Sequence, residues 1–167
     1  HPTLDMVMVE IASPLVASQG LGVQVRYPGV NPAINPDPTS FAAVGEQSLT
    51  LTAYDSGDLR LRRTLDDTTY YSGITASGRI EQSGADAFVA SSTGRDRLTV
   101  MVRFDQQMLS GPPPVAYSAG IQAVTTHWND FWTKGGAVDF SGSTDPRAAE
   151  LERRVVLSQY LSAVNGA

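Results

Sequence analysis

The chain has 167 residues, which is room for one ordinary domain or part of a larger protein, but not for a large multidomain enzyme. Hydrophobic residues make up 41% and charged residues 17%, so the chain has enough apolar material to fold around a core. Twelve basic and seventeen acidic residues give a formal net charge of −5, which argues against nucleic acid as the partner. Cysteine is absent and the only imidazoles are His1 and His127, so we expect no metal site, no thiolate chemistry and no cofactor.

The first forty-five residues contain two strand patterns and a loop. Residues 3–13 are apolar on both faces, which predicts a central strand covered on both sides. Residues 23–27 alternate between apolar and polar side chains and predict a half-exposed strand. Residues 28–45 hold four prolines, which favours a long loop; loops of this length often have a functional role.

The middle of the chain consists of short alternating patterns with turn residues between them. We expect a hairpin whose turn lies at residues 55–58. Further strands are predicted over residues 69–76, 79–82, 87–91 and 97–104. No helical pattern interrupts them, so the sequence predicts an antiparallel β-sandwich and not a parallel α/β sheet.

Two helices are expected after the sandwich. Residues 117–134 place Ile121, Trp128 and Trp132 at helical spacing, and Gly135 and Gly136 end that helix. A second helix is predicted from residue 145 to residue 163 or 164. Its apolar residues spread around most of its circumference, so it should contact neighbours on several sides. The expected fold is thus mainly β, with two C-terminal α-helices.

The usual catalytic motifs are absent or incomplete. Gly20 and Gly22 lack the third glycine and the helix of a dinucleotide-binding loop, and Lys134 lacks the glycine spacing of a phosphate-binding loop. His127 has Asp130 three residues later, which favours a pair on the helix surface over a catalytic base. Glycoside cleavage requires two facing carboxylates, and nothing in the sequence brings two together.

Trp128 and Trp132 lie one helical turn apart on the same face. Aromatic residues at this spacing can form a platform on which a sugar stacks. They more often belong to a core or to a domain interface, and both possibilities stay open.

The segments 127–132, 135–140 and 145–161 resemble the six-hairpin glycosidases, and so does the opening of the chain, residues 1–7. In that superfamily a super-sandwich of the kind found in trehalose and kojibiose hydrolases and phosphorylases is joined by linker helices to an (α/α)₆ barrel. The resemblance implies a sandwich portion over residues 1–111, a linker with a helix over 112–142, and the first helix of a truncated barrel over 143–167.

The same resemblance implies that the chain is a non-catalytic piece of a secreted glycoside hydrolase. Its general acid and base would lie in the barrel, outside this chain, so no catalytic residue is assigned here. The expected partners are the rest of the parent enzyme and its carbohydrate substrate, with no nucleic acid and no membrane. The alternative is a free-standing module that binds carbohydrate through Trp128, Trp132 or the pair Tyr70 and Tyr71, or a structural sandwich without a ligand.

Overall fold

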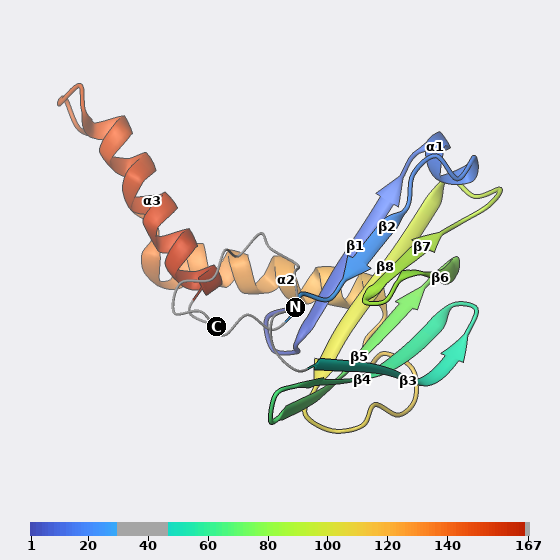
Figure 1. Cartoon of the computed structure of the whole chain (residues 1–167). Helices are drawn as coiled ribbons and strands as arrows, with labels where there is room; N and C mark the ends of the chain where they lie inside the picture. Colours follow the sequence, from blue (N-terminus) through green and yellow to red (C-terminus); the bar gives the residue numbers. More distant parts are fainter. Residues whose placement is uncertain (30–46, 166–167) are drawn as a thin grey trace. The chain divides into compact units, whose positions relative to one another are not determined.

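The computed structural model describes residues 1–29 and 47–165, which form two compact units (Figure 1). The first unit covers residues 1–121 and contains all the strands, and the second begins at residue 122 and contains the helical C-terminal part. Because most of the predicted loop 28–45 lies outside the described residues, that prediction is not tested.

The larger sheet of the first unit has five antiparallel strands in the order β1-β8-β5-β4-β3. The strands are β1 (Met6–Ala12), β3 (Gln47–Asp55), β4 (Asp58–Leu65), β5 (Thr68–Ala76) and β8 (Arg97–Asp105). The β3–β4 hairpin turns at residues 56–57, where the sequence predicts a turn.

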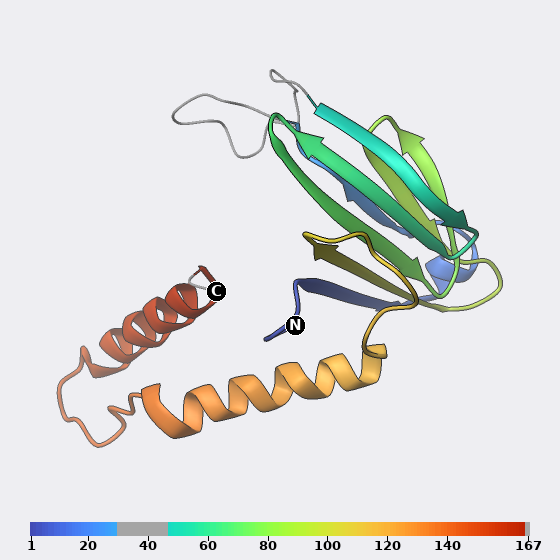
Figure 2. The same cartoon turned by 90° about the horizontal axis from the view of Figure 1, so that it is seen from below.

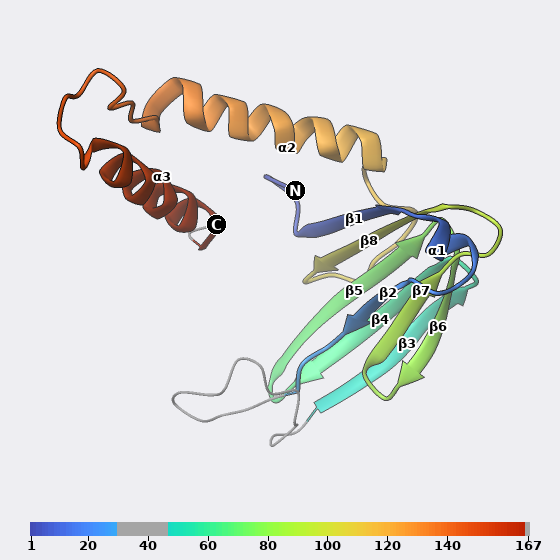
Figure 3. The ribbon, with the colours of Figure 1, turned by 90° about the horizontal axis from the view of Figure 1, so that it is seen from above.

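A smaller sheet of three antiparallel strands packs against the larger one (Figure 3). It has the order β2-β7-β6 and is formed by β2 (Val23–Arg26), β6 (Arg79–Gly84) and β7 (Ala87–Ser91). Side chains of both sheets share one core, whose buried members are Val16, Tyr27, Leu59, Leu61, Ile74, Ile80, Phe88, Ala90, Leu98 and Val100. The predicted sandwich followed by helices is therefore confirmed.

The position of strand β1 in the sheet differs from the position that the sequence predicts. Its apolar residues on both faces predict a central strand, but β1 lies at the edge of the five-stranded sheet that the described residues form. Val7 on this strand is 57% exposed. Apolar residues on both faces of a strand therefore do not tell whether the strand is central or lies at an edge.

A short helix, α1 (Pro14–Ala17), closes one side of the core and has no counterpart in the sequence analysis. The Ser13 hydroxyl accepts a hydrogen bond from the Leu15 amide and so caps the helix, and Pro14 occupies its first turn. Val16 is completely buried. Four residues are too few for a periodic pattern, so only the cap signal could have indicated this helix.

The helices α2 (Tyr117–Phe131) and α3 (Ala148–Asn165) follow the sandwich (Figure 2). A π-helical turn, η1 (Trp132–Gly136), extends α2 and ends at the predicted glycine pair. The second helix begins three residues after Asp145, whose carboxylate accepts a hydrogen bond from the Arg147 amide just before the helix. No described residue of α3 is buried.

Candidate functional site

A buried arginine organises the interior of the sandwich. Arg63 on β4 is fully buried and donates hydrogen bonds to Asp86 Oδ1 at 2.8 Å, to the Pro28 carbonyl at 2.6 Å and to Gln47 Oε1 at 2.9 Å. Its guanidinium also lies 5.9 Å from the centre of the Tyr27 ring. These contacts engage both terminal nitrogens of the buried guanidinium, whereas its Nε has no hydrogen-bond partner among the described residues. Because they join β4 to the chain at Pro28 and Gln47, we assign Arg63 a structural role.

Tyr27 extends this network across the core. Its hydroxyl and that of Ser72 lie 2.7 Å apart, and Ser72 donates onward to the Arg103 carbonyl at 3.0 Å. Burial raises the pKa of Tyr27 to about 12, although the Ser72 hydrogen bond acts in the opposite direction. A phenol that stays neutral so far into the alkaline range is protonated at neutral pH, where it donates its hydroxyl hydrogen to Ser72 and cannot act as a base.

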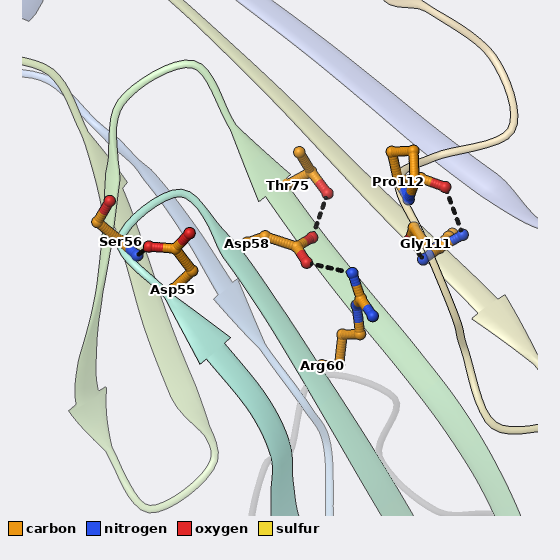
Figure 4. Close-up of polar contacts among 8 residues, drawn as sticks. Asp55, Ser56, Asp58, Arg60, Thr75, Gly111 and Pro112 are labelled. Atoms are coloured by element: carbon orange, nitrogen blue, oxygen red, sulfur yellow. Dashed lines mark hydrogen bonds and ion pairs between the residues drawn. The ribbon is translucent and has the colours of Figure 1, made fainter.

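A polar cluster lies on the opposite face of the larger sheet, away from the core (Figure 4). Asp58 on β4 accepts hydrogen bonds from Arg60 at 2.7 Å and from the Thr75 hydroxyl at 2.9 Å. Arg103 on β8 donates to the carbonyls of Gly111 at 2.7 Å and Pro112 at 3.2 Å. Burial lowers the pKa of Arg103, and the positive charge of Arg60 lowers it further.

The contacts of Arg103 hold the segment after β8 against the sheet. Gly73 on β5 makes the close approach possible, because a Cβ atom there would lie 3.0 Å from Leu109 Cδ1 and 3.1 Å from Arg103 Nε. Any larger residue would push these side chains away. The Arg103 guanidinium therefore holds the segment at residues 109–112 against the sheet. The absence of a side chain at Gly73 leaves the room that Leu109 occupies.

This fixed segment forms one wall of a cavity of about 410 Å³ at the end of β8. The cavity is lined by residues of three segments, namely Thr3, Leu4, Asp5, Met6, Arg103, Phe104, Asp105, Gln106, Gln107, Leu109 and Pro114. Backbone pairing brings the segments together, since the Phe104 amide donates to the Asp5 carbonyl at 2.8 Å. The sequence analysis missed this site because no pattern reveals that β1 and β8 are neighbours.

Two carboxylates, Asp5 and Asp105, line the same cavity. Asp105 Oδ1 accepts a hydrogen bond from the Gln107 amide at 2.9 Å, and its charge raises the pKa of Arg103. Within the described residues, no side chain donates a hydrogen bond to the Asp5 carboxylate. The cavity therefore combines acceptors, amides and one cation in a single place.

Four other carboxylates have structural partners. Asp55 caps the hairpin turn through the Ser56 amide, and Asp130 pairs with Lys134 at 2.8 Å rather than with His127. Glu152 accepts from the Phe140 amide at 2.7 Å. The hydrogen bonds of Arg153 and Arg154 lower the pKa of Glu150 to about 2, as expected for a carboxylate between two arginines.

Trp128 and Trp132 belong to an aromatic cluster of the helical unit. Their rings are stacked with centroids 6.3 Å apart, and Tyr160 of α3 lies 5.3 Å from Trp128. Phe131 meets both tryptophans edge to face, at 5.4 Å and 4.7 Å. This arrangement favours an interface between α2 and α3 over a free sugar-stacking platform, because neighbouring rings surround Trp128.

Neither a metal site nor a membrane-spanning helix is found among the described residues. No three carboxylate, imidazole or thiolate groups in that part of the chain come together to hold a metal ion. None of the described helices combines the length and the apolar character that crossing a bilayer requires.

The described residues thus form an antiparallel two-sheet sandwich with a polar cavity, and a helical hairpin follows it in the chain. Comparison with protein-family models, with curated proteins and with solved structures finds no match for the chain.

Proposed function

We propose that this chain is the non-catalytic sandwich, linker and first barrel helix of a secreted glycoside hydrolase. Its partner would be the catalytic (α/α)₆ barrel, and that barrel would supply the acid and base that cleave the glycosidic bond. The sandwich would brace the barrel.

Helix α3 is the observation that carries this proposal. It is eighteen residues long, yet none of its described residues is buried. Four aliphatic side chains are between 44% and 51% exposed, namely Leu151, Leu157, Leu161 and Val164. An isolated helix gains little from exposing them, whereas packing against further helices would bury them and stabilise the helix.

The aromatic cluster gives a second line of support. Trp128 and Tyr160 join α2 to α3, so α3 is already held by one neighbour and keeps its aliphatic side chains for others. Helices of multi-helix folds pack their apolar faces against several neighbouring helices. A complete binding module has no evident need for such a helix, and for this reason we rank the free-standing module second.

The test is to purify the native polypeptide that contains this sequence from its source, and to measure its intact mass and its cleavage of α-linked glucosides with water and with phosphate. We expect a mass larger than this chain and cleavage of at least one glycoside. A pure native polypeptide that cleaves none would contradict the proposal.

A substitution in α3 tests whether the activity of the native enzyme depends on the contacts of this helix. Leu157→Asp places a charge on the exposed aliphatic surface of α3, so it should lower the activity or the thermal midpoint of the native enzyme. Ser162→Asp is the matched control, because it adds the same charge at an exposed polar position of the same helix without removing an apolar side chain. Equal effects of the two variants would show that α3 makes no apolar contact with a barrel.

A further inference from the structure

The larger sheet carries an apolar strip that is only partly covered. The strip consists of Val7 on β1 and of Val102 and Phe104 on β8. The strand register places these side chains on the same face of the sheet as the core residues Leu98 and Val100. Val102 packs against the core, but Val7 is 57% exposed and Phe104 is 38% exposed. The strip therefore continues the core beyond its covered part.

The smaller sheet packs over β3, β4 and β5, beside the strip. At its β6 edge, the Tyr54 hydroxyl of β3 donates a hydrogen bond to the Ile80 carbonyl at 2.7 Å. At its β2 edge, the hydroxyl of Tyr27, which directly follows β2, lies 2.7 Å from that of Ser72 on β5. In the larger sheet β8 and β1 come after β5, so they lie on the side of β2 that is opposite to β6 (Figure 3). The strip is therefore next to the outer edge of β2.

The β6 edge of the smaller sheet is closed by hydrogen bonds. Alternate residues of an antiparallel edge strand direct their N–H and C=O groups away from the neighbouring strand. Ile80 is such a residue: its amide donates to the Ser56 carbonyl at 2.7 Å, and its carbonyl accepts the hydrogen bond from Tyr54. The register of β6 with β7 also shifts between Gln82 and Gly84, and a bulge of this kind hinders the addition of another strand.

The β2 edge, in contrast, is open. Within the part of the chain that the structure describes, β7 is the only strand paired with β2. The Tyr27 amide donates to the Asp86 carbonyl at 2.9 Å, so residues 23, 25 and 27 direct their backbone groups toward β7. Gln24 therefore directs its amide and its carbonyl to the side of the strip. Unpaired backbone groups at a sheet edge are a template for a further strand.

The space beside β2 fits an extended segment and not a second folded copy. Neighbouring strands lie about 4.8 Å apart, so β8 and β1 extend the larger sheet by roughly 10 Å beyond β2. This width accommodates one or two added strands. A second copy that paired its own β2 antiparallel with this one would bring its β8 and β1 into the same space, where the two larger sheets would overlap.

The surroundings also define the side chains of that segment. A strand paired with β2 would direct alternate residues toward Val7 and Phe104, and apolar residues there would remove both side chains from water. The residues between them would face away from the core, on the same face as the exposed side chain of Gln24, where polar residues are suited.

We propose that β2 and the strip bind an extended segment of the native polypeptide that lies outside this chain and has apolar residues at alternate positions. The segment adds a strand to the smaller sheet and covers Val7 and Phe104. Only the source of the segment rests on the proposed function, because the longer native polypeptide supplies it.

The test compares the isolated chain with the native polypeptide by hydrogen–deuterium exchange, resolved to single residues by mass spectrometry. We expect the Gln24 amide to exchange at least about ten-fold more slowly in the native polypeptide, because the added strand accepts its hydrogen bond. Gln82 is the matched control, since it lies two residues after Ile80 on β6 and its amide also points away from β7. Its exchange should be the same in both proteins.

A pair of substitutions tests the strip itself. Val7→Ser makes the strip more polar, and Leu15→Ser on α1 is the control, because Leu15 is 56% exposed and lies outside the strip. In the isolated chain both should change the thermal midpoint only slightly, since more than half of each side chain is in water. In the native polypeptide we expect Val7→Ser to lower the midpoint by about 3 °C more than in the isolated chain, whereas the effect of Leu15→Ser should stay the same.

The proposal is overturned if the Gln24 amide exchanges equally fast in both proteins, or if Val7→Ser costs no more in the native polypeptide than in the isolated chain. Slow exchange of Gln24 in the isolated chain that depends on protein concentration would also overturn it, because a second copy would then occupy the edge. A native polypeptide no longer than this chain would contradict both proposals.

Cleavage of glycosides by the native polypeptide is measured separately. A longer polypeptide that protects the Gln24 amide but cleaves no glycoside would refute the proposed function alone. One that cleaves a glycoside and leaves the Gln24 amide unprotected would refute only the added strand.

Discussion

Arg63 shows at the scale of one residue how a sandwich can depend on a charge in its interior. Its guanidinium has no exposed surface and serves three acceptors on three segments of the chain. Removing one partner from such a network leaves the other groups buried without hydrogen bonds, and this cost exceeds the net gain from forming the network.

We therefore expect Arg63→Lys to lower the free energy of unfolding by about 2–4 kcal/mol, because one ammonium cannot reach all three acceptors in a fixed plane. The next residue provides the control. Arg62→Lys on the exposed side of β4 should change stability by less than about 0.5 kcal/mol. Urea unfolding followed by far-UV circular dichroism compares them, and equal midpoints would contradict the role of Arg63.

Tyr27 makes the stability of the sandwich dependent on alkaline pH. The pKa of its phenol is raised from 10.0 to about 12 in the folded chain. Below pH 10 the phenol is neutral in both states, and its full contribution is present. Between pH 10 and 12 the unfolded chain loses the proton first, so the free energy of unfolding falls, by up to about 3 kcal/mol.

Tyr27→Phe should remove this part of the pH dependence while retaining the ring against Phe88. Burial also raises the pKa of Tyr70, so the variant should keep a smaller decline of its own. Urea midpoints of both proteins at pH 9 and at pH 11.5 give the comparison. If the urea midpoints of the two proteins fell by the same amount between pH 9 and pH 11.5, Tyr27 would not be the group whose titration lowers the stability.

At the scale of elements, the connection between β5 and β6 depends on one glycine. A Cβ atom at Gly78 would lie 1.9 Å from the Ser91 carbonyl oxygen on β7, which is backbone and cannot rotate away. Gly78→Ala should therefore destabilise the sandwich by roughly 2 kcal/mol or more, because the smaller sheet would have to shift.

Gly84, at the other end of β6, provides the matched control. A Cβ atom there would lie 3.5 Å from the Ala87 Cβ atom, an ordinary contact, so Gly84→Ala should be tolerated. Thermal unfolding of the two variants separates these expectations. A Gly78→Ala midpoint at or above that of Gly84→Ala would contradict the close approach.

The strands and helices could be predicted from the sequence because their periodicity is local. Leu59 and Leu61 alternate with arginines, and Trp128 and Trp132 recur at helical spacing. The pairing of β1 with β8 could not be predicted, because it joins residues about ninety positions apart. The cavity could not be predicted for the same reason, since the segments that contain Asp5 and Asp105 come together only through that pairing.

At the scale of the whole molecule, the two units differ in how their side chains are buried. The sandwich encloses a continuous core, whereas no described residue of α3 is buried. Both tryptophans of the chain lie in the helical unit, so their fluorescence reports on that unit alone. The amide NMR signals of the strand residues report on the sandwich, and they give an independent probe of that unit.

We expect the tryptophan signal of the isolated chain to change at a lower urea concentration than the β-sheet signal, since a unit with few buried apolar contacts opens first. Trp132→Ala removes the ring stacked on Trp128, so it should lower the first transition and leave the second in place. Coincident transitions in both proteins would mean that the units unfold together. In that case the helical unit would be as stable as the sandwich without a barrel, which would remove the main support for the proposed function.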